Sequence, residues 1–396
     1  MSKFLFVSSY DTRRNTSGNI RLVALMKGLH DAGHVVHCIF SPTDKESDSI
    51  IFNTLSQMDR IITFPKIDFK PVPKGANIAS SGKVNLKTRL SRFFIKLYTP
   101  LTVYDVYKLK VDRVSLDDLR ELDDEYDYIV SSSDPKSSHV FAEKIIRLKH
   151  YKAKWIMYWG DPMTSDVSAY KIFTGRVKNE ERKLIRKSDL SVYTNSCVVE
   201  YMKHKYPEVA SKITWIPTSD IKDNDVEQVV PDRKKIGYFG DYSPVYRNII
   251  PFYEACVQNE FDTIICGSGS GVELSSTDTI QVKGRVSRKE VNEFEKECKV
   301  LIVIENKTKT GECIQIPGKL YHYALTHKEI LVITESNNLA RDYGHYNRFH
   351  FVPNNSHDIA DALKSIFNNS DSRISSEPLA AFMPENIVKQ FESLIQ

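Results

Sequence analysis

Short apolar segments alternate with amphipathic segments along the whole chain. Residues 3–8 and 35–40 are continuous apolar runs rich in β-branched and aromatic side chains, which is typical of strands buried in a parallel sheet. Between them, the apolar positions of residues 19–32 recur with a helical period, as on one face of a helix. This order of strand, helix and strand predicts that the chain opens with a βαβ unit of an α/β fold.

The same alternation continues to the end of the chain. Residues 50–64 predict a helix and a short strand, and a helix also begins at Lys319. Later strands are mostly followed by helices, as α/β folds require. The other predicted strands are 126–131, 154–159, 190–194, 213–216, 235–239, 263–266, 300–304, 330–334 and 349–352, and the other predicted helices are 139–148, 174–187, 198–205, 248–256, 288–297, 338–343, 356–367 and 384–395.

The length of 396 residues predicts two domains, and the hydrophobic content of 41% is sufficient for two cores. Residues 221–234 are polar and nearly free of aromatic side chains, so we expect the linker there. The chain after the linker opens as the first domain does, with a strand, a loop beginning at Gly240 and a helix. The predicted domains are therefore 1–220 and 235–383, followed by a last helical segment, 384–396.

One loop of the second half has the character of an anion site. The apolar run 300–304 ends in a polar loop, after which Pro317 and Gly318 open the helix that begins at Lys319. Proline suits a helix start, glycine allows a ligand to approach the backbone, and the dipole there favours an anion. The alternative is an ordinary strand–loop–helix connection.

Two loops of the first half are further candidates. Gly18, Asn19 and Arg21 stand where the first helix begins and could bind a phosphate or a sugar, although a plain helix start explains them equally well. The loop lacks the G-x-G-x-x-G fingerprint, so a nicotinamide cofactor is not expected. Asp161 follows the strand 154–159 and could orient or deprotonate an acceptor hydroxyl; the alternative is a turn before Pro162.

Two similar α/β halves imply a cleft between the loops at the carboxyl ends of their strands. In the second half these loops hold Gly240, Arg247, Arg285 and Lys319, and cations combined with glycines suit a diphosphate. Such cations could stabilise the charge that develops on a nucleoside diphosphate leaving group without a metal. The run that starts at Gly267, GSGSG, fits a tight sugar-nucleotide loop or a plain turn better than a dinucleotide motif.

Positive charge is concentrated in one segment. Residues 66–113 hold eleven Lys or Arg and three Asp or Glu, a net charge of +8, whereas the whole chain has +4. Residues 86–98 read as a basic amphipathic helix suited to an anionic membrane surface, or alternatively as a core-facing helix with a solvated basic face. A local anionic partner is expected rather than nucleic acid. The candidate membrane or acceptor contacts in this helix are Lys87, Arg89, Arg92, Phe93, Phe94 and Lys96.

The compartment follows from features that the sequence lacks. It has no apolar run long enough to span a bilayer and no signal-peptide pattern after Met1. The six cysteines form no C-x-x-C pair, and most stand in apolar elements, so they are expected to be reduced. Together with the basic segment, this predicts a cytoplasmic protein bound peripherally at the inner face of the cytoplasmic membrane.

Four segments carry a resemblance to a known family over nearly the whole chain. They are FLFVSSYDTRRNTSGNIRLVALMKGLHDAGHVV, WIMYWGDP, KIGYFGDYSPVYRN and, most specifically, CIQIPGKLYHYALTHKEILVI. The sequence resembles the GT-B glycosyltransferases, most closely the GT4-type enzymes of bacterial surface polysaccharide synthesis, such as lipopolysaccharide O-antigen or capsule. The resemblance implies two Rossmann-like domains facing across a cleft. It also implies that the C-terminal domain binds a nucleotide sugar, that the N-terminal domain takes the acceptor, and that the last helix returns to the N-terminal domain.

The family's donor residues are only partly kept. Gly240 matches, but Asp241 stands where an arginine is usual, while Arg247 falls at the place of the usual lysine. His322 occupies the place of a glutamate that commonly holds the ribose, and the paired glutamate of the family is missing near Gln315. The residues that the resemblance and the loops together nominate for the donor are Gly18, Gly240, Arg247, Gly267, Arg285, Gln315, Ile316, Pro317, Gly318, Lys319, Leu320 and His322.

We therefore expect a metal-independent, retaining glycosyltransferase with Asp161, Arg247 and Lys319 as catalytic residues. Its donor would be a UDP- or GDP-linked sugar used as a substrate, with no separate cofactor, and its acceptor a polyprenyl-linked sugar or a polysaccharide. Two alternatives stay open. A sugar-nucleotide epimerase or hydrolase of the same fold would need an acid/base set, for which His322 and Glu312 are the further candidates. A non-catalytic nucleotide-sugar-binding subunit would fit the missing glutamates.

Overall fold

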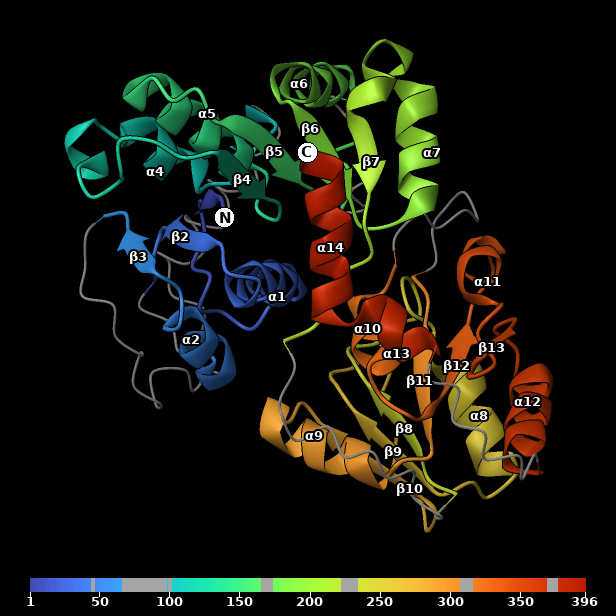
Figure 1. Cartoon of the computed structure of the whole chain (residues 1–396). Coiled ribbons are helices and arrows are strands. Elements are labelled where there is room, and N and C mark those ends of the chain that lie inside the picture. Colours follow the sequence, from blue (N-terminus) through green and yellow to red (C-terminus); the bar gives the residue numbers. More distant parts are fainter. Residues whose placement is uncertain are drawn as a thin grey trace. The chain divides into compact units, whose positions relative to one another are not determined.

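The computed structural model describes residues 1–43, 47–65, 98, 102–164, 174–221, 234–306, 316–368 and 377–396. The chain divides into two compact units (Figure 1). The first unit comprises Met1–Ile221 together with Pro384–Gln396, and the second comprises Lys222–Met383. The predicted linker lies almost entirely outside the described residues, and so does most of the basic segment, including the helix predicted at 86–98.

The first unit is built on a seven-stranded sheet in the order β3-β2-β1-β4-β5-β6-β7, in which every pairing is parallel. The chain starts inside the sheet at β1, extends to one edge through β2 and β3, and returns to the other side of β1 with β4. Loops from neighbouring strands therefore meet at the carboxyl edge beside β1 and β4. The strands are β1 (Lys3–Ser8), β2 (Val35–Phe40), β3 (Arg60–Thr63), β4 (Tyr128–Ser132), β5 (Lys154–Tyr158), β6 (Leu190–Tyr193) and β7 (Ile213–Trp215).

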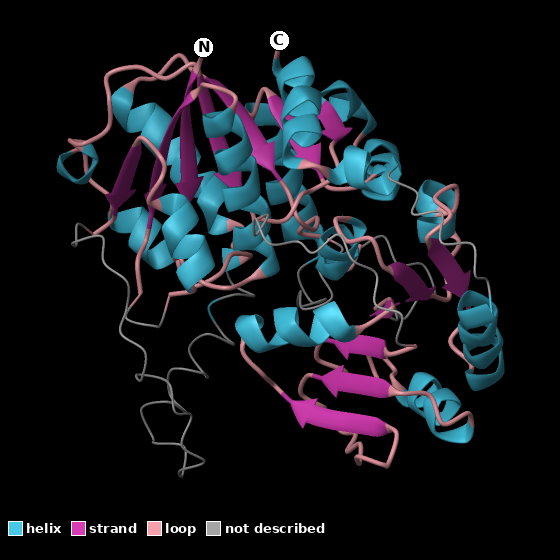
Figure 2. Ribbon diagram, turned by 60° about the horizontal axis from the view of Figure 1, so that its bottom comes forward, coloured by secondary structure: helices cyan, strands magenta, loops and turns pink. Residues whose placement is uncertain are grey.

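Helices connect these strands and cover the sheet (Figure 2). Right-handed crossovers on the two sides of β1 place helices on opposite faces. Consistent with this, residues of α1 and α2 share one apolar core with the strands, whereas α4 packs on α5. The helices are α1 (Ser17–Asp31), α2 (Ser49–Leu55), α4 (Lys108–Arg113), α5 (Ser137–Lys149), α6 (Thr174–Lys187) and α7 (Ser196–Lys205), with short 3-10 turns η1 (Asp117–Leu119) and η3 (Pro207–Lys212).

The C-terminal helix α14 (Pro384–Ile395) completes the first unit by packing on α1 (Figure 1). Its apolar face, which includes Ile387 and Phe391, joins the core beneath α1. Gly28 of α1 permits the close approach, because a Cβ at this position would stand 2.5 Å from a methyl carbon of Val388. The last turn is fixed by Lys154, whose Nζ donates to the carbonyl oxygen of Ile395 at 3.0 Å.

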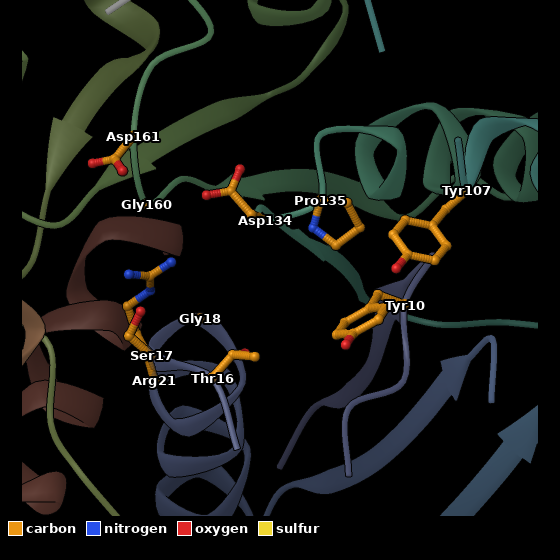
Figure 3. A pocket seen from close by; sticks show the side chains of 10 residues that line it. All are labelled: Tyr10, Thr16, Ser17, Gly18, Arg21, Tyr107, Asp134, Pro135, Gly160 and Asp161. Carbon is orange, nitrogen blue, oxygen red and sulfur yellow. The ribbon is translucent and has the colours of Figure 1, made fainter. Parts of the chain in front are cut away.

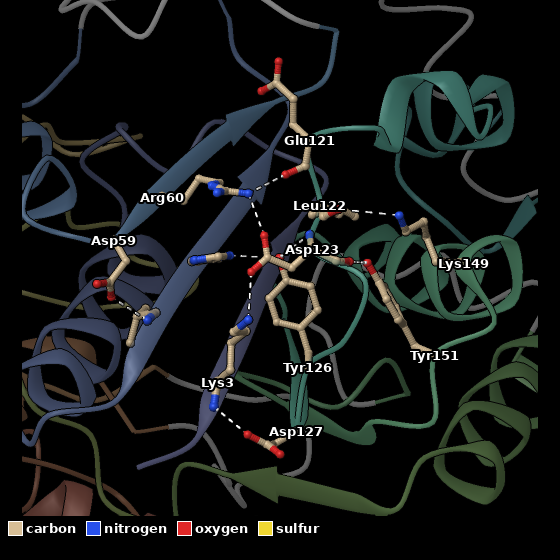
Figure 4. Close-up of polar contacts among 12 residues, drawn as sticks. Lys3, Asp59, Arg60, Glu121, Leu122, Asp123, Tyr126, Asp127, Lys149 and Tyr151 are labelled. Atoms are coloured by element: carbon tan, nitrogen blue, oxygen red, sulfur yellow. Dashed lines mark hydrogen bonds and ion pairs between the residues drawn. The ribbon is translucent and has the colours of Figure 1, made fainter.

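A polar network joins the amino ends of the strands in the first unit (Figure 4). Asp123 accepts hydrogen bonds from Lys3 Nζ at 2.9 Å and from Arg60 Nη1 at 2.6 Å, so one carboxylate connects β1 and β3 to the segment before β4. Tyr126 lies beside it and its hydroxyl is 2.9 Å from His37 Nδ1 on β2. This network lies at the sheet edge opposite the loops that follow the strands, so its role is structural.

The second unit contains a six-stranded sheet in the order β10-β9-β8-β11-β12-β13, again with every pairing parallel. Apolar cores lie on both faces of the sheet. The strands are β8 (Ile236–Phe239), β9 (Thr263–Cys266), β10 (Ile280–Gly284), β11 (Val300–Ile304), β12 (Glu329–Ile333) and β13 (Phe349–Val352), and the helices are α8 (Ile250–Gln258), α9 (Arg288–Glu297), α10 (Gly318–Ala324), α11 (Asn338–Tyr343), α12 (Ser356–Asn368) and α13 (Glu377–Phe382).

The predicted α/β class is confirmed, and the predicted strands and helices within the described residues are present with small shifts at their ends. Sequence reasoning missed β10, α4 and α13. The polar residues of β10 conceal a strand at the sheet edge, where Ile280 is buried but Gln281 and Lys283 are exposed. None of the helices in the described part of the chain combines the length and the apolar character needed to span a lipid bilayer.

Candidate functional sites at the carboxyl ends of the strands

The first unit has a cavity of about 270 Å³ where the loops after β1, β4 and β5 meet the start of α1 (Figure 3). This is the sheet edge at which a parallel α/β fold presents ligand-binding loops. The cavity brings together three residues that the sequence nominated, namely Gly18, Arg21 and Asp161. Its other lining residues are Tyr10, Thr16, Ser17, Tyr107, Asp134, Pro135 and Gly160.

Arg21 is held at the side of this cavity by both a backbone carbonyl and an aromatic ring. Its Nη2 donates to the carbonyl oxygen of Ser133 at 2.9 Å, and its guanidinium lies 5.6 Å from the centre of the Tyr158 ring. Gly160 makes room for it, because a Cβ there would stand 2.5 Å from Arg21 Nη2. The buried Nε of Arg21 has no hydrogen-bond partner among the described residues.

Asp161 stands in the loop that follows β5, and a buried carboxylate fixes that loop. Glu181 of α6 is fully buried and accepts hydrogen bonds from the backbone N–H of Met163 at 2.5 Å and from Thr164 Oγ1 at 2.7 Å. The hydroxyl of Tyr206 donates to the same carboxylate at 2.8 Å. A carboxylate with three donors sets the path of the backbone two residues after Asp161.

Asn19 has a different place from the other candidates at the start of α1. Its side chain is buried, and Nδ2 donates to the carbonyl oxygens of Asp11 and Arg14, both at 2.9 Å. The same loop is stiffened by a buried two-pronged ion pair, in which Arg13 Nε and Nη2 contact the two carboxylate oxygens of Asp11 at 2.9 and 2.8 Å. Asn19 thus shapes the loop before α1 and is not among the residues that line the cavity.

In the second unit, the loops after β8 and β9 come into close backbone contact. The N–H of Gly240 donates to the carbonyl oxygen of Cys266 at 2.8 Å, and the N–H of Gly267 donates to that of Gly284 at 2.7 Å. A Cβ on Gly267 would overlap with the carbonyl oxygen of Gly240, so only glycine fits. A Cβ on Gly240 would stand 3.6 Å from Lys319 Cε, which places the Lys319 side chain directly beside this loop.

Lys319 and Arg247 form the cationic part of this edge. Burial lowers the pKa of Lys319 to about 8; nearby Glu295 opposes this shift, whereas Arg247 and Arg288 add to it. Among the described residues no carboxylate lies within ion-pair distance of the Lys319 ammonium. Arg247 is anchored through Nη2 to Asn306 Oδ1 at 2.9 Å and through Nη1 to the carbonyl oxygen of Asp241 at 3.2 Å, and its buried Nε lacks a partner in the described ranges.

Arg285 is placed differently from these two cations. It forms an exposed ion pair with Asp241, the residue that stands where the resembled family usually has an arginine. Asp241 also accepts a hydrogen bond from the N–H of Ser268 at 2.9 Å. These contacts, with the Arg285 pair, hold the pKa of Asp241 below its ordinary value against the opposing effect of burial, which is the largest single influence. Arg285 therefore neutralises a neighbouring carboxylate and joins the loops after β8 and β10.

His322 faces a carboxylate of α9. Its Nε2 lies 2.8 Å from Oε2 of Glu295, a buried side chain. Glu305, at the end of β11, is likewise buried, and accepts a hydrogen bond from Ser336 Oγ at 3.2 Å and another from Thr334. Among the described residues, the buried carboxylates near α10 therefore come from α9 and from the residue after β11, whereas α10 itself carries His322.

The remaining nominated donor residues differ in their exposure. Gly318 is exposed, Pro317 precedes the first turn of α10, and Ile316 packs at the margin of the apolar core. Leu320 is fully buried in that core and serves to fix the helix. Gln315 lies outside the described residues, as do the six nominated residues of the basic helix 86–98.

Sequence reasoning missed the tyrosines and Asp134 at the first-unit cavity. Tyr10 follows β1 and Tyr107 precedes α4, and their ring centres lie 5.0 Å apart. Asp134 and Pro135 come directly after β4. The position of Asp134 just beyond a strand was a usable signal, of the same kind that nominated Asp161. Tyr107 could not be found in this way, because it comes from a connection that contains no strand.

The fold, but not a sequence family, is shared with known proteins. No protein-family model and no curated protein sequence matches this chain. Among solved structures, Anabaena HepE in complex with UDP and glucose matches with a TM-score of 0.62 at 11% identity, over 100% of this chain and 99% of that one. Sucrose-phosphate synthase from Thermosynechococcus elongatus matches with a TM-score of 0.63 at 12% identity, over 100% and 98%.

A variant of S. aureus TarM, in complex with fondaparinux, alpha-GlcNAc-glycerol and UDP, matches with a TM-score of 0.58 at 11% identity, over 100% of both chains. These likenesses extend over both units and over the full length of the proteins compared. The chain therefore has the GT-B fold, two Rossmann-like domains, as predicted.

Proposed function

We propose that the protein is a glycosyltransferase that moves a sugar from a nucleotide sugar to a carbohydrate-containing acceptor. The observation that carries this proposal is that two cationic side chains, Lys319 and Arg247, lie near each other beside the loop that begins at Gly240. No carboxylate among the described residues forms an ion pair with Lys319, and burial outweighs the favourable effect of nearby Glu295, so its charge is costly unless an anion is present. A diphosphate bound there would receive charge-assisted hydrogen bonds from both side chains.

The chemistry follows from the charge that a leaving nucleoside diphosphate develops. As the bond between the sugar and the diphosphate breaks, negative charge grows on the leaving oxygen, and fixed cations stabilise this charge. Lys319 and Arg247 would supply that stabilisation with no metal. UDP is favoured as the nucleotide because the HepE and TarM complexes contain it. Retention of anomeric configuration rests on the family resemblance alone.

Asp161 would act on the acceptor. It follows β5 and lines a cavity that is too small for a large cofactor but suits a sugar hydroxyl near its carboxylate. A carboxylate at hydrogen-bond distance can orient a hydroxyl and take its proton as the new bond forms. The acceptor class that we propose is a polyprenyl-linked sugar or a polysaccharide of the bacterial surface, held at the cytoplasmic face of the membrane by the basic segment 66–113.

A panel of nucleotide sugars tests the proposal directly. Incubation of the full chain with UDP- and GDP-linked hexoses should give slow release of free nucleoside diphosphate, which increases when an acceptor glycan is added. The Lys319→Ala and Arg247→Ala variants should each lose about 2–4 kcal/mol of transition-state stabilisation, the scale of one missing charge-stabilising donor. Full activity in both variants would refute the assignment of the site.

The same panel separates the competing functions. Interconversion of sugar epimers without net transfer would identify an epimerase, and binding without turnover would identify a non-catalytic subunit. The membrane part of the proposal has its own measurement. Binding to vesicles that contain anionic lipid should fall steeply as the salt concentration rises. It should also fall when four basic residues are neutralised, namely Lys87, Arg89, Arg92 and Lys96. Unchanged binding would refute the membrane part of the proposal.

A further inference from the structure

We propose that the cavity of the first unit binds one neutral sugar ring, with Tyr10 and Tyr107 as an aromatic wall and with Arg21, Asp134 and Asp161 as hydrogen-bonding partners for its hydroxyls. The identification of this sugar as the terminal ring of the acceptor rests on the proposed function. The selection of a neutral sugar rests on the cavity itself.

The aromatic wall is the first argument. The two tyrosine rings come from segments far apart in the sequence, yet their centres lie 5.0 Å apart with an angle of 52° between the ring planes. Figure 3 shows both rings at one side of the cavity, with Arg21 and Asp161 at the opposite side. A pyranose has C–H groups that carry partial positive charge, which match the negative face of an aromatic ring, and hydroxyls around its rim. The cavity offers partners for both.

The wall is built in advance by a chain of buried polar groups. Ser137, at the start of α5, is fully buried, and its Oγ lies 2.6 Å from Ser9 Oγ, next to Tyr10. The same hydroxyl donates to Asp105 Oδ1 at 2.5 Å, and this oxygen also accepts the N–H of Tyr107 at 3.1 Å. One hydroxyl thus connects the segments that carry the two rings. A preorganised wall loses little entropy when a ligand binds.

The charges at the cavity decide which ligand it selects. The lining contains one guanidinium, that of Arg21, and two carboxylates, those of Asp134 and Asp161. Lys136 pairs with Asp134 from outside the lining. Arg21 and Lys136 thus balance the two carboxylates, and a phosphate or diphosphate placed there would find no net positive charge to attract it. Neutral hydroxyls are instead good donors to carboxylates and good acceptors for a guanidinium.

The size of the cavity points to a single ring. Its volume of about 270 Å³ lies just below the range of roughly 300–1,000 Å³ that holds drug-sized ligands. One sugar ring fits within it, and the rest of a longer glycan, or a lipid diphosphate, would stay outside. The site would read the terminal residue of an acceptor rather than its anchor.

Direct binding to small neutral glycosides tests the inference without a donor. Saturation-transfer NMR with the methyl glycosides of glucose, galactose and N-acetylglucosamine should show binding of at least one of them to the full chain. Tyr10→Ala and Tyr107→Ala should each weaken this binding about tenfold, since each removes one aromatic face. Tyr107→Phe should retain it, because the ring remains. Tyr201→Ala is the matched control, since Tyr201 is an exposed tyrosine of α7 that does not line the cavity.

The possible results separate the inference from the proposed function. Preferential binding of inorganic pyrophosphate or a hexose 1-phosphate, in competition with the glycosides, would overturn it. The absence of glycoside binding would also overturn the inference. Thermal unfolding shows whether Tyr10→Ala and Tyr107→Ala fold, and a folded variant that binds the glycosides as well as the wild type does would overturn the inference too. If glycosides bind but no nucleotide sugar is turned over, the proposed function fails and the sugar site stands. If nucleotide sugars are turned over and no glycoside binds, the proposed function stands and the sugar site is refuted.

Discussion

The buried carboxylate of Glu181 lies 2.8 Å from the hydroxyl of Tyr206 and also binds the loop that carries Asp161. This arrangement makes Glu181 a positioning residue for the proposed acceptor site. Substitution Glu181→Gln keeps the shape but turns an amide N–H₂ toward groups that are themselves donors. We expect the kcat for sugar transfer to fall about 10–100-fold, the scale seen when a group that orients a functional residue is lost.

Binding of UDP provides the control for this prediction. Lys319 and Arg247 belong to the second unit, so the dissociation constant for UDP, measured by titration calorimetry, should be unchanged in Glu181→Gln. Tyr206→Phe removes one of the three donors to Glu181 and leaves the hydrogen bond from the Met163 N–H in place, so it should reduce kcat less. A parallel loss of UDP affinity in Glu181→Gln would show general unfolding rather than a local effect.

The lowered pKa of Lys319 predicts how donor use depends on pH. The cation that would bind the diphosphate is present below a pKa of about 8 and is lost as the pH rises through that value. The kcat/KM for the nucleotide sugar, which reports the free enzyme, should therefore decline above about pH 8. Lys319→Arg keeps a positive charge throughout this range and should lack this decline, even if its activity is lower. An identical alkaline limb in both proteins would exclude Lys319 as its source.

The contact between Gly28 and Val388 predicts a steric effect on stability. A methyl group added at Gly28 would stand 2.5 Å from a Val388 methyl carbon, so Gly28→Ala should push α14 away from α1. Overpacking of this kind costs about 1–3 kcal/mol, more than the roughly 1 kcal/mol by which alanine favours a helix over glycine. Thermal unfolding of Gly28→Ala should occur at a lower temperature. The double variant with Val388→Ala should recover part of the loss, and strict additivity would contradict the contact.

Much of the fold could be predicted because parallel sheets have a strong sequence pattern. Runs such as Val300–Ile304 are buried on both faces, so they consist almost wholly of apolar residues and stand out from their surroundings. An edge strand lacks this signal, and Ile280–Gly284 was missed since its exposed positions are polar. The short helix Lys108–Arg113 was missed for a related reason, because its charged residues made it part of a basic segment.

The candidate sites were only partly predictable. Gly18, Arg21 and Asp161 were nominated because each follows a strand or opens a helix, and the structure brings them to one cavity. The pairing of Arg285 with Asp241, and that of His322 with Glu295, depend on contacts between elements distant in sequence. No periodicity reveals such contacts. The same holds for Tyr107, which reaches the cavity only because Asp105 and Ser137 bind its segment to α5.

The lowered pKa of Asp123 predicts that the first unit loses stability in acid. Its hydrogen bond with Lys3 is the main cause that lowers the pKa of its carboxyl below the ordinary value. A carboxyl with a lowered pKa stabilises the fold above its unfolded pKa of about 3.9, and this contribution is lost as the pH falls through the folded value.

Because Lys3 and Arg60 are partly exposed, the network is worth only about 1 kcal/mol. Asp123→Asn should therefore lower the Tm at pH 7 by about 2–4 °C, the shift expected for a unit of this size. It should have a smaller effect at pH 3, because this pH is below the unfolded pKa and part of the stabilisation that comes from the lowered pKa has been lost there. Differential scanning calorimetry at the two pH values measures this, and an equal loss of Tm at both would show that packing of Asp123 rather than its charge supports the sheet.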